Sequence, residues 1–106
     1  MLYRFTGILK MTRAEQISLN RKAIQRLAKK YGVTDIRVFG SAARGDDTTQ
    51  SDVDFLVEME PGRSLFDMGG LLIDLETLLG CRVDIVTENS LHWYIRDRVL
   101  SEARAL

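Results

Sequence analysis

The sequence contains one cysteine, Cys81, and one proline, Pro61, and it has no long apolar run. A single cysteine cannot form a disulfide within the chain, and a bilayer-spanning helix needs roughly 18–20 consecutive apolar residues. Residues 1–10 also lack the long apolar centre and the small-residue cleavage site of a secretory signal. These absences predict a cytoplasmic protein without a membrane partner.

The chain also lacks an excess of charge, since it has 15 basic and 15 acidic residues. A general nucleic-acid-binding protein is usually clearly basic, so we expect no direct nucleic-acid partner. The charges are nevertheless divided along the chain. Residues 1–30 hold eight basic residues and one acidic residue, whereas residues 31–106 hold seven basic and fourteen acidic residues. We therefore expect metal cations to bind in the second part.

The length of 106 residues, 45% of them hydrophobic, suits one compact domain with a single modest core. We predict an N-terminal arm over residues 1–12 and one domain over residues 13–106. Two alternatives are open for the start of the arm: either it becomes ordered on a partner, or translation begins at Met11.

Helical and extended patterns alternate along the predicted domain. Thr12 and Glu15 form a capping-box pattern before apolar residues at helical spacing, and Ser64 with Asp67 marks another helix start. Segments rich in β-formers separate the helical ones. The patterns predict helices over residues 13–31, over residues 64–79 and from residue 90 onward, strands over residues 35–40, 52–57 and 82–87, and a loop over residues 41–51.

The order of these elements restricts the topology of the sheet. A helix between the second and third strands almost requires a parallel pair with a right-handed crossover. The connection between the first and second strands is too short for such a crossover, so we expect that pair to be antiparallel. The predicted fold class is α/β of the α+β type, a small mixed sheet with helices packed on it. In this topology one edge of the sheet brings together Gly40, Ser41, Asp52, Asp54 and Asp84.

Three of these residues are candidate metal ligands and catalytic residues. Asp52 and Asp54 point to the same face because they lie two apart on a strand, and Asp84 on the neighbouring strand would complete the set. Clustered acids repel one another unless cations neutralise them, and Mg²⁺ is the usual ion where phosphates supply further ligands. Two Mg²⁺ ions about 3.5–4 Å apart would suit in-line phosphoryl or nucleotidyl transfer.

Gly40, Ser41 and Arg44 are candidate residues for binding phosphates. Glycine lets the backbone approach a phosphate closely, and amides at the start of a short helix attract anions. The Ser41 hydroxyl adds a hydrogen bond, and Arg44 one turn later offers the paired donors of a guanidinium. The segment is not a P-loop, because Lys-Ser or Lys-Thr does not follow the glycines, and the dinucleotide pattern Gly-x-Gly-x-x-Gly is absent. Kinase and Rossmann functions are therefore excluded.

Other conspicuous residues have simpler explanations. His92 has no second histidine or nearby cysteine with which to share a metal, so we expect a structural or surface role. Cys81 is expected to pack rather than to react. Trp93 and Tyr94 make the last helix apolar on more than one side, which either core packing or a protein interface would explain.

Three strings together resemble the signature of the DNA polymerase beta-like nucleotidyltransferases. They are Gly40-Ser-Ala-Ala-Arg-Gly45, Ser51-Asp-Val-Asp-Phe-Leu-Val57 and Val83-Asp-Ile-Val-Thr87. The chain is most similar to the minimal nucleotidyltransferases (MNT), from about residue 35 to the C-terminus. The resemblance implies the polymerase beta-like nucleotidyltransferase fold, with the three aspartates as metal ligands and the Gly-Ser turn at the triphosphate. None of these positions departs from the family pattern.

Family members of this size resemble one half of a two-gene toxin–antitoxin module whose other half is a HEPN-type ribonuclease (higher eukaryote and prokaryote nucleotide-binding domain). The resemblance implies an antitoxin that adenylylates a tyrosine of this toxin from ATP within a hetero-oligomer. The size agrees, because we expect no accessory domain for gripping RNA, DNA or an antibiotic. The alternative is a non-catalytic antitoxin that neutralises its partner by occlusion. A small-molecule nucleotidyltransferase of the aminoglycoside-modifying sort would need a further acceptor-binding domain.

Overall fold

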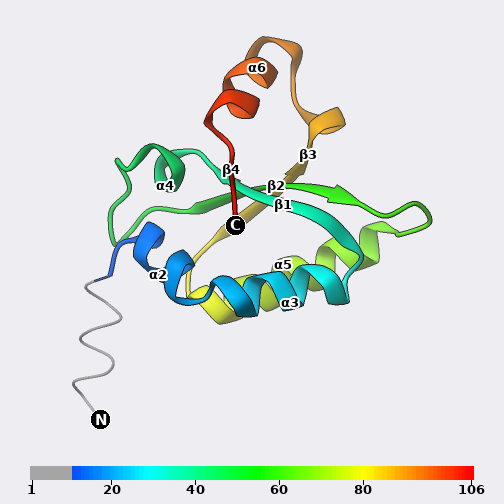
Figure 1. Ribbon diagram of the computed structural model, residues 1–106, viewed down its shortest axis with the longest axis horizontal. Coiled ribbons are helices and arrows are strands. Elements are labelled where there is room, and N and C mark those ends of the chain that lie inside the picture. The colour runs from blue at the N-terminus through cyan, green and yellow to red at the C-terminus, as the bar shows by residue number, and fades with distance from the viewer. Residues whose placement is uncertain (1–10) are drawn as a thin grey trace.

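The computed structural model describes residues 11–106, so the predicted arm lies outside the described residues except for its last two positions. Figure 1 shows a sheet with α3 and α5 on one face and α6 on the other. The elements are α2 (Arg13–Leu19), α3 (Arg21–Lys30), β1 (Val33–Phe39), α4 (Ser41–Arg44), β2 (Val53–Met59), α5 (Leu65–Leu79), β3 (Val83–Thr87), the 3₁₀ turn η1 (Glu88–Ser90), α6 (Trp93–Glu102) and β4 (Arg104–Ala105).

The strands form one mixed sheet in the order β3-β2-β1-β4. β1 is antiparallel to β2, and β2 is parallel to β3, so the predicted mixed α/β fold is confirmed. β4 adds an antiparallel partner on the other side of β1, opposite Arg37 and Val38. The sequence does not predict β4, because a strand of two residues carries no periodicity.

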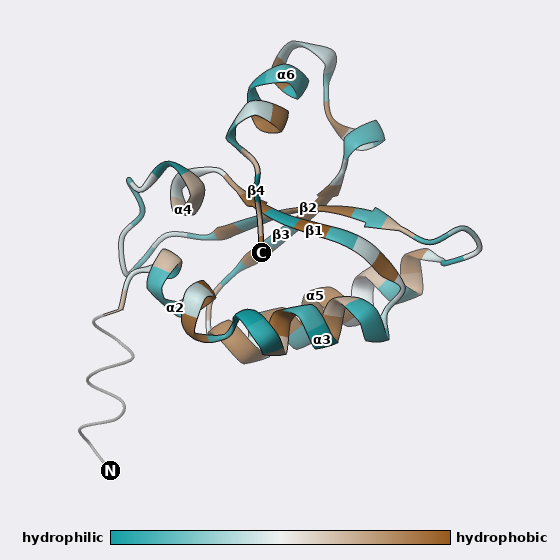
Figure 2. Ribbon diagram, viewed as in Figure 1, coloured by the Kyte–Doolittle hydropathy of each residue, from teal (hydrophilic) through white to brown (hydrophobic). Residues whose placement is uncertain are grey.

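The main core lies between the sheet and the layer formed by α3 and α5. Val38 of β1 and the fully buried Phe55 of β2 meet Ile24 of α3 and Leu75 of α5 there. Figure 2 shows that α5 is hydrophobic along most of its length, whereas α3 alternates between hydrophilic and hydrophobic residues. Burying a large apolar side chain stabilises a fold by about 1.5–3 kcal/mol, so this layer supplies most of the stability.

The opposite face of the sheet has only a small apolar cluster beneath α6. Leu56 of β2 is 6% exposed and Val99 of α6 is 4% exposed, and neither belongs to the main core. The alternation along β2 explains the division, because Phe55 and Leu56 point to opposite faces. Asp54 lies on the same face as Leu56, so the candidate site forms on the side of the sheet that α6 covers.

The prediction of one continuous helix over residues 13–31 is wrong, because the helix is divided at Asn20. Asn20 has φ −100° and ψ 12°, and its Nδ2 donates a hydrogen bond of 2.8 Å to the backbone oxygen of Gln16. Asparagine competes with helical hydrogen bonds in this way and favours helix ends. The buried side chain of Gln16 donates in turn to the backbone oxygen of Leu79 at 2.9 Å, which joins α2 to the end of α5.

Other boundaries also differ from the prediction: β1 is Val33–Phe39 rather than 35–40, and β2 is Val53–Met59 rather than 52–57. The segment 41–51 is not entirely a loop, because its first four residues form α4. The last helix begins at Trp93 rather than at residue 90, because η1 occupies the preceding turn. No helix within residues 11–106 is both long and apolar enough to cross a membrane.

Candidate active site

Two carboxylates face each other across adjacent parallel strands. The register of β2 and β3 places Asp54 directly beside Asp84. The register of β1 and β2 places Asp54 opposite Phe39, the last residue before the Gly40-Ser41 turn. The predicted convergence of the turn with these two aspartates is therefore present in the sheet.

The environment of Asp54 disfavours a negative charge. Burial of the half-buried side chain raises the pKa of Asp54, and repulsion by Asp84 and then Asp52 raises it further, while Arg44 acts in the opposite direction. A divalent cation between the carboxylates would remove this repulsion. The donors are hard carboxylate oxygens, the type that Mg²⁺ prefers, so this pair fits the ion chemically.

Gly40 allows the turn to approach the carboxylates. Its φ of 74° lies in the left-handed region, and a β-carbon at this position would overlap Oδ2 of Asp54. Ser41 follows as the first residue of α4, so its amide is one of the helix-initial N–H groups that lack a partner within the helix. Only glycine lets the backbone turn here while the Asp54 carboxylate packs against it.

A cavity of about 510 Å³ contains this arrangement. Its floor is the end of the sheet and the Gly40-Ser41 turn, and its roof is α6. The predicted residues among those lining it are Gly40, Ser41, Arg44, Asp54 and Asp84.

Asp52 is placed differently from the other two aspartates. It is exposed, precedes β2 and does not line the cavity, although it is near enough to raise the pKa of Asp54. Within residues 11–106, no three acidic, histidine or cysteine side chains lie close enough together to form a metal site. The structure therefore brings together two of the three predicted acids, with Asp52 beside them.

Arg44 has carboxylate partners of its own. Its Nε lies 3.2 Å from Oδ2 of Asp46, and its Nη1 lies 3.2 Å from Oε2 of Glu102. The second contact connects α4 to α6 across the cavity. Both carboxylates raise the pKa of Arg44, so the guanidinium stays fully charged at the cavity wall.

The contribution of α6 to this cavity was not predicted from the sequence. Ile95, Arg98, Val99 and Glu102 all line it. Their spacing places them on one face of a helix, and two charged residues on such a face are the signal that could have revealed a polar site.

Cys81 and His92 do not join the site. Burial raises the pKa of the Cys81 thiol, so the sulfur is mostly neutral and a poor nucleophile. His92 is exposed and stacks on Tyr94 with ring centroids 5.5 Å apart.

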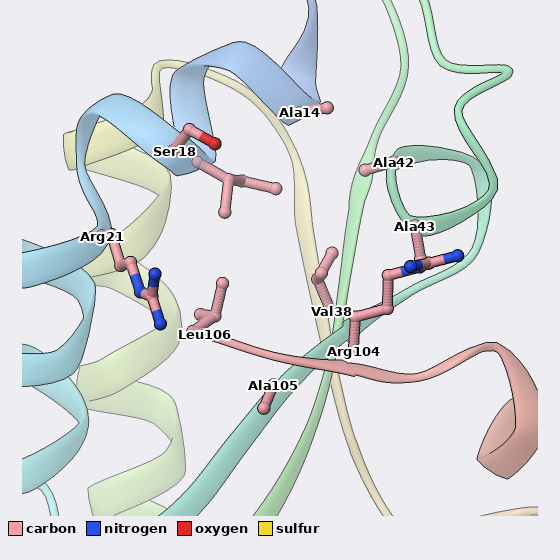
Figure 3. A pocket seen from close by; sticks show the side chains of 10 residues that line it. Ala14, Ser18, Arg21, Val38, Ala42, Ala43, Arg104, Ala105 and Leu106 are labelled. Carbon is pink, nitrogen blue, oxygen red and sulfur yellow. The ribbon is translucent and has the colours of Figure 1, made fainter.

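A second hollow of about 210 Å³ lies between α2, α4 and β4 (Figure 3). Arg21 lies beside Leu106 at one side of it, and Arg104 extends toward Ala43 at the other. No acidic side chain lines this hollow, and Val38 forms part of its apolar wall. It cannot hold a hard cation through side chains, so we place the chemistry in the cavity with the carboxylates.

Comparison with known proteins gives matches over most of the chain. Residues 20–106 match the family model described as a nucleotidyltransferase domain. The protein adenylyltransferase MntA of Thermococcus cleftensis is 46% identical over 76 residues, which are 72% of this chain and 77% of MntA.

Solved structures show the same fold. A candidate minimal nucleotidyltransferase aligns with 45% identity and a TM-score of 0.78, over 88% of this chain and 95% of that chain. A mutant form of the toxin–antitoxin MntA–HpeT aligns with 25% identity and a TM-score of 0.66, over 82% of this chain and 71% of that chain. The sequence match extends over most of the chain and the structural match over nearly all of a minimal relative, so this chain belongs to the nucleotidyltransferase domain family, in its minimal type, and is a nucleotidyltransferase enzyme.

Proposed function

We propose that this nucleotidyltransferase is an antitoxin that transfers AMP from ATP to a tyrosine of a HEPN-type partner toxin, with Mg²⁺ as its cofactor. The observation that carries the proposal is the pairing of Asp54 with Asp84 in a cavity that also contains a Gly-Ser turn. The relatives support a protein acceptor, since one is a protein adenylyltransferase and another is a toxin–antitoxin complex. The proposed assembly is a hetero-oligomer with the toxin.

The proposed roles follow from where the side chains lie. Asp54 and Asp84 would hold Mg²⁺, and the nearby Asp52 would join them as a third ligand. When bound, Mg²⁺ supplies positive charge to the transferring phosphate and lowers the proton affinity of the acceptor hydroxyl. The Gly40 turn and the Ser41 amide and hydroxyl would bind phosphate oxygens at the start of α4.

The transfer exchanges one phosphorus–oxygen bond for another. The phenolic oxygen of the acceptor forms a bond to the α-phosphorus, the bond to the oxygen bridging the β-phosphate breaks, and pyrophosphate leaves. The phenolic proton passes to the carboxylate pair.

The acceptor would approach along α6. Trp93 and Tyr94 at its start are 85% and 67% exposed, which is unusual for large aromatic side chains. Leu91 and Ile95, on either side of them in the sequence, line the cavity. A partner that covers the two aromatic rings would therefore have its flexible segment beside the carboxylates.

Intact-mass spectrometry of the proposed partner toxin, to be sought in the reading frames next to this gene, tests the proposal. Incubation with the chain, Mg²⁺ and ATP should add the mass of AMP to the toxin, and Asp54→Asn should reduce the rate by about 100-fold or more, because a metal ligand is lost. Glu58→Gln is the matched control, since Glu58 is an exposed acid on the same strand that does not line the cavity.

The non-catalytic alternative gives a different result. If the toxin is neutralised without any change in mass, and Asp84→Ala neutralises it equally well, then occlusion is the function. Addition of a nucleotide other than AMP would retain the transfer reaction and overturn the proposed donor.

A further inference from the structure

One arginine in the cavity, Arg98, has no role in the proposed transfer reaction. Arg98 is on the face of α6 that lines the cavity, next to the buried Val99 that anchors the helix to the sheet. Val99 holds α6 over the floor, so Arg98 stands on the opposite wall from Asp54 and Asp84, with its side chain exposed to solvent. A cation is thereby present on the roof of a site whose floor is acidic.

The two arginines of the cavity differ in their partners. The Arg44 guanidinium is bound by Asp46 and Glu102. Within residues 11–106, the Arg98 guanidinium makes no ion pair and no hydrogen bond, and the Ser101 hydroxyl donates to the backbone oxygen of Arg98 rather than to its side chain. Arg96 on the same helix is paired with Glu88 outside the cavity. Of the two arginines that line the cavity within residues 11–106, Arg98 is therefore the one whose side chain is available to bind an anion.

The carboxylates determine which part of a nucleotide this cation meets. The α-phosphorus has to lie at Asp54 and Asp84, where the bond exchange takes place. The β- and γ-phosphates carry most of the negative charge, and the Gly40-Ser41 turn would contact them from one side only, so their remaining oxygens would face α6 across the cavity. A guanidinium on the roof offers paired donors that match phosphate oxygens.

We infer that Arg98 binds the β- and γ-phosphates of the nucleoside triphosphate from α6 and so selects a triphosphate over a monophosphate. The inference rests on the proposed function, since it assumes that a nucleotide occupies this cavity. It adds a second wall to the phosphate site, opposite the Gly40-Ser41 turn. It also assigns α6 a nucleotide contact in addition to any contact with a partner.

Isothermal titration of the full chain with Mg²⁺ and either a non-hydrolysable ATP analogue or AMP tests the inference. Arg98→Ala should bind the ATP analogue about 10-fold to 100-fold more weakly, because hydrogen bonds to charged phosphate oxygens are lost. Its affinity for AMP should change by less than about 2-fold, and Arg98→Lys should recover part of the loss. Arg96→Ala is the matched control and should bind both ligands like the unaltered chain. Urea unfolding of each variant verifies that the fold is retained.

Three results would overturn the inference. They are unchanged binding of the ATP analogue by Arg98→Ala, an equal loss for the analogue and for AMP, and an equal loss in Arg96→Ala. The proposed function fails separately: if Arg98 discriminates ATP from AMP as expected but the toxin gains no mass, then the phosphate contact stands and the acceptor is wrong. If the unaltered chain binds no nucleotide, both are overturned.

Discussion

Asp54 is held against a second carboxylate inside the cavity, and this makes the stability of the metal-free protein depend on pH. Its pKa in the native state is raised above the ordinary value of 3.8, so the folded chain holds this proton more tightly than the unfolded chain does. The stability that Asp54 contributes is therefore fully present below pH 3.8 and is lost as the pH rises through the raised pKa.

We therefore predict that, at pH values above the raised pKa of Asp54, Asp54→Asn has a higher free energy of unfolding than the unaltered chain. The difference should shrink as the pH falls toward 3.8. Urea unfolding in the presence of a chelator, at a series of pH values, measures it. Glu58→Gln, on the same strand but outside the cavity, should show no comparable gain. A stability difference for Asp54→Asn that grows on acidification would contradict the assigned electrostatics.

Magnesium should reverse the destabilising repulsion. A ligand that binds only the native state stabilises it by about 1.4 kcal/mol at ten times its dissociation constant. Adding Mg²⁺ should therefore raise the Tm of the chelator-treated chain, and the rise should be smaller in Asp54→Asn and Asp84→Asn. Equal rises in all three proteins would place the ion elsewhere.

Gly40 and Gly45 separate the effect of backbone conformation from that of crowding. Both have positive φ, but a β-carbon would overlap the Asp54 carboxylate only at Gly40, whereas Gly45 has open space around it. Gly45→Ala should lower the free energy of unfolding by about 1 kcal/mol through strain, and Gly40→Ala by about 2–3 kcal/mol. Gly40→Ala should also reduce transfer, and Gly45→Ala should not. Similar values for the two variants in urea unfolding would remove the argument for a close approach.

At the level of elements, the contact between α4 and α6 competes with the nucleotide. Glu102 occupies one side of the Arg44 guanidinium and brings a negative charge into the cavity. Glu102→Gln should therefore tighten binding of the ATP analogue by up to about 5-fold, since a partly exposed ion pair contributes at most about 1 kcal/mol. The matched control is Glu88→Gln, which frees Arg96 outside the cavity. Weaker binding by Glu102→Gln in calorimetry would show that the contact supports the site instead.

The elements differ in how well the sequence predicts them. β2, α5 and β3 have clear periodicity and a capping box, so their order implied the parallel pair that places Asp54 beside Asp84. The break at Asn20 has a local signal, since asparagine favours helix ends, but the helical spacing of apolar residues continues across it. The buried hydrogen bond from Gln16 to Leu79, which is distant in sequence, joins α2 to the end of α5 and could not be predicted. Tertiary contacts of this kind override local helical preference.

At the level of the whole molecule, the sequence did not show on which face of the sheet α6 packs. Periodicity identifies the apolar side of a helix, but Ile95 and Val99 would suit either face of the sheet. Arg98 and Glu102 therefore could not be assigned to the same cavity as the aspartates before the fold was known. Motif residues could be predicted because one turn and two paired strands position them, whereas the roof depends on packing between distant segments.

The unequal apolar clusters on the two faces of the sheet imply that the molecule does not open as one unit. The main core is continuous from α3 and α5 to the strands, whereas α6 is attached chiefly through Val99. Elements with few buried contacts undergo local unfolding at a lower free energy than the global transition. The backbone amides of α6 should therefore exchange with deuterium well before those of α5. β3 and β4, which precede and follow α6 in the chain, should stay paired in the sheet while α6 unfolds locally. Access to the catalytic floor would then be set by a small local equilibrium rather than by the stability of the fold.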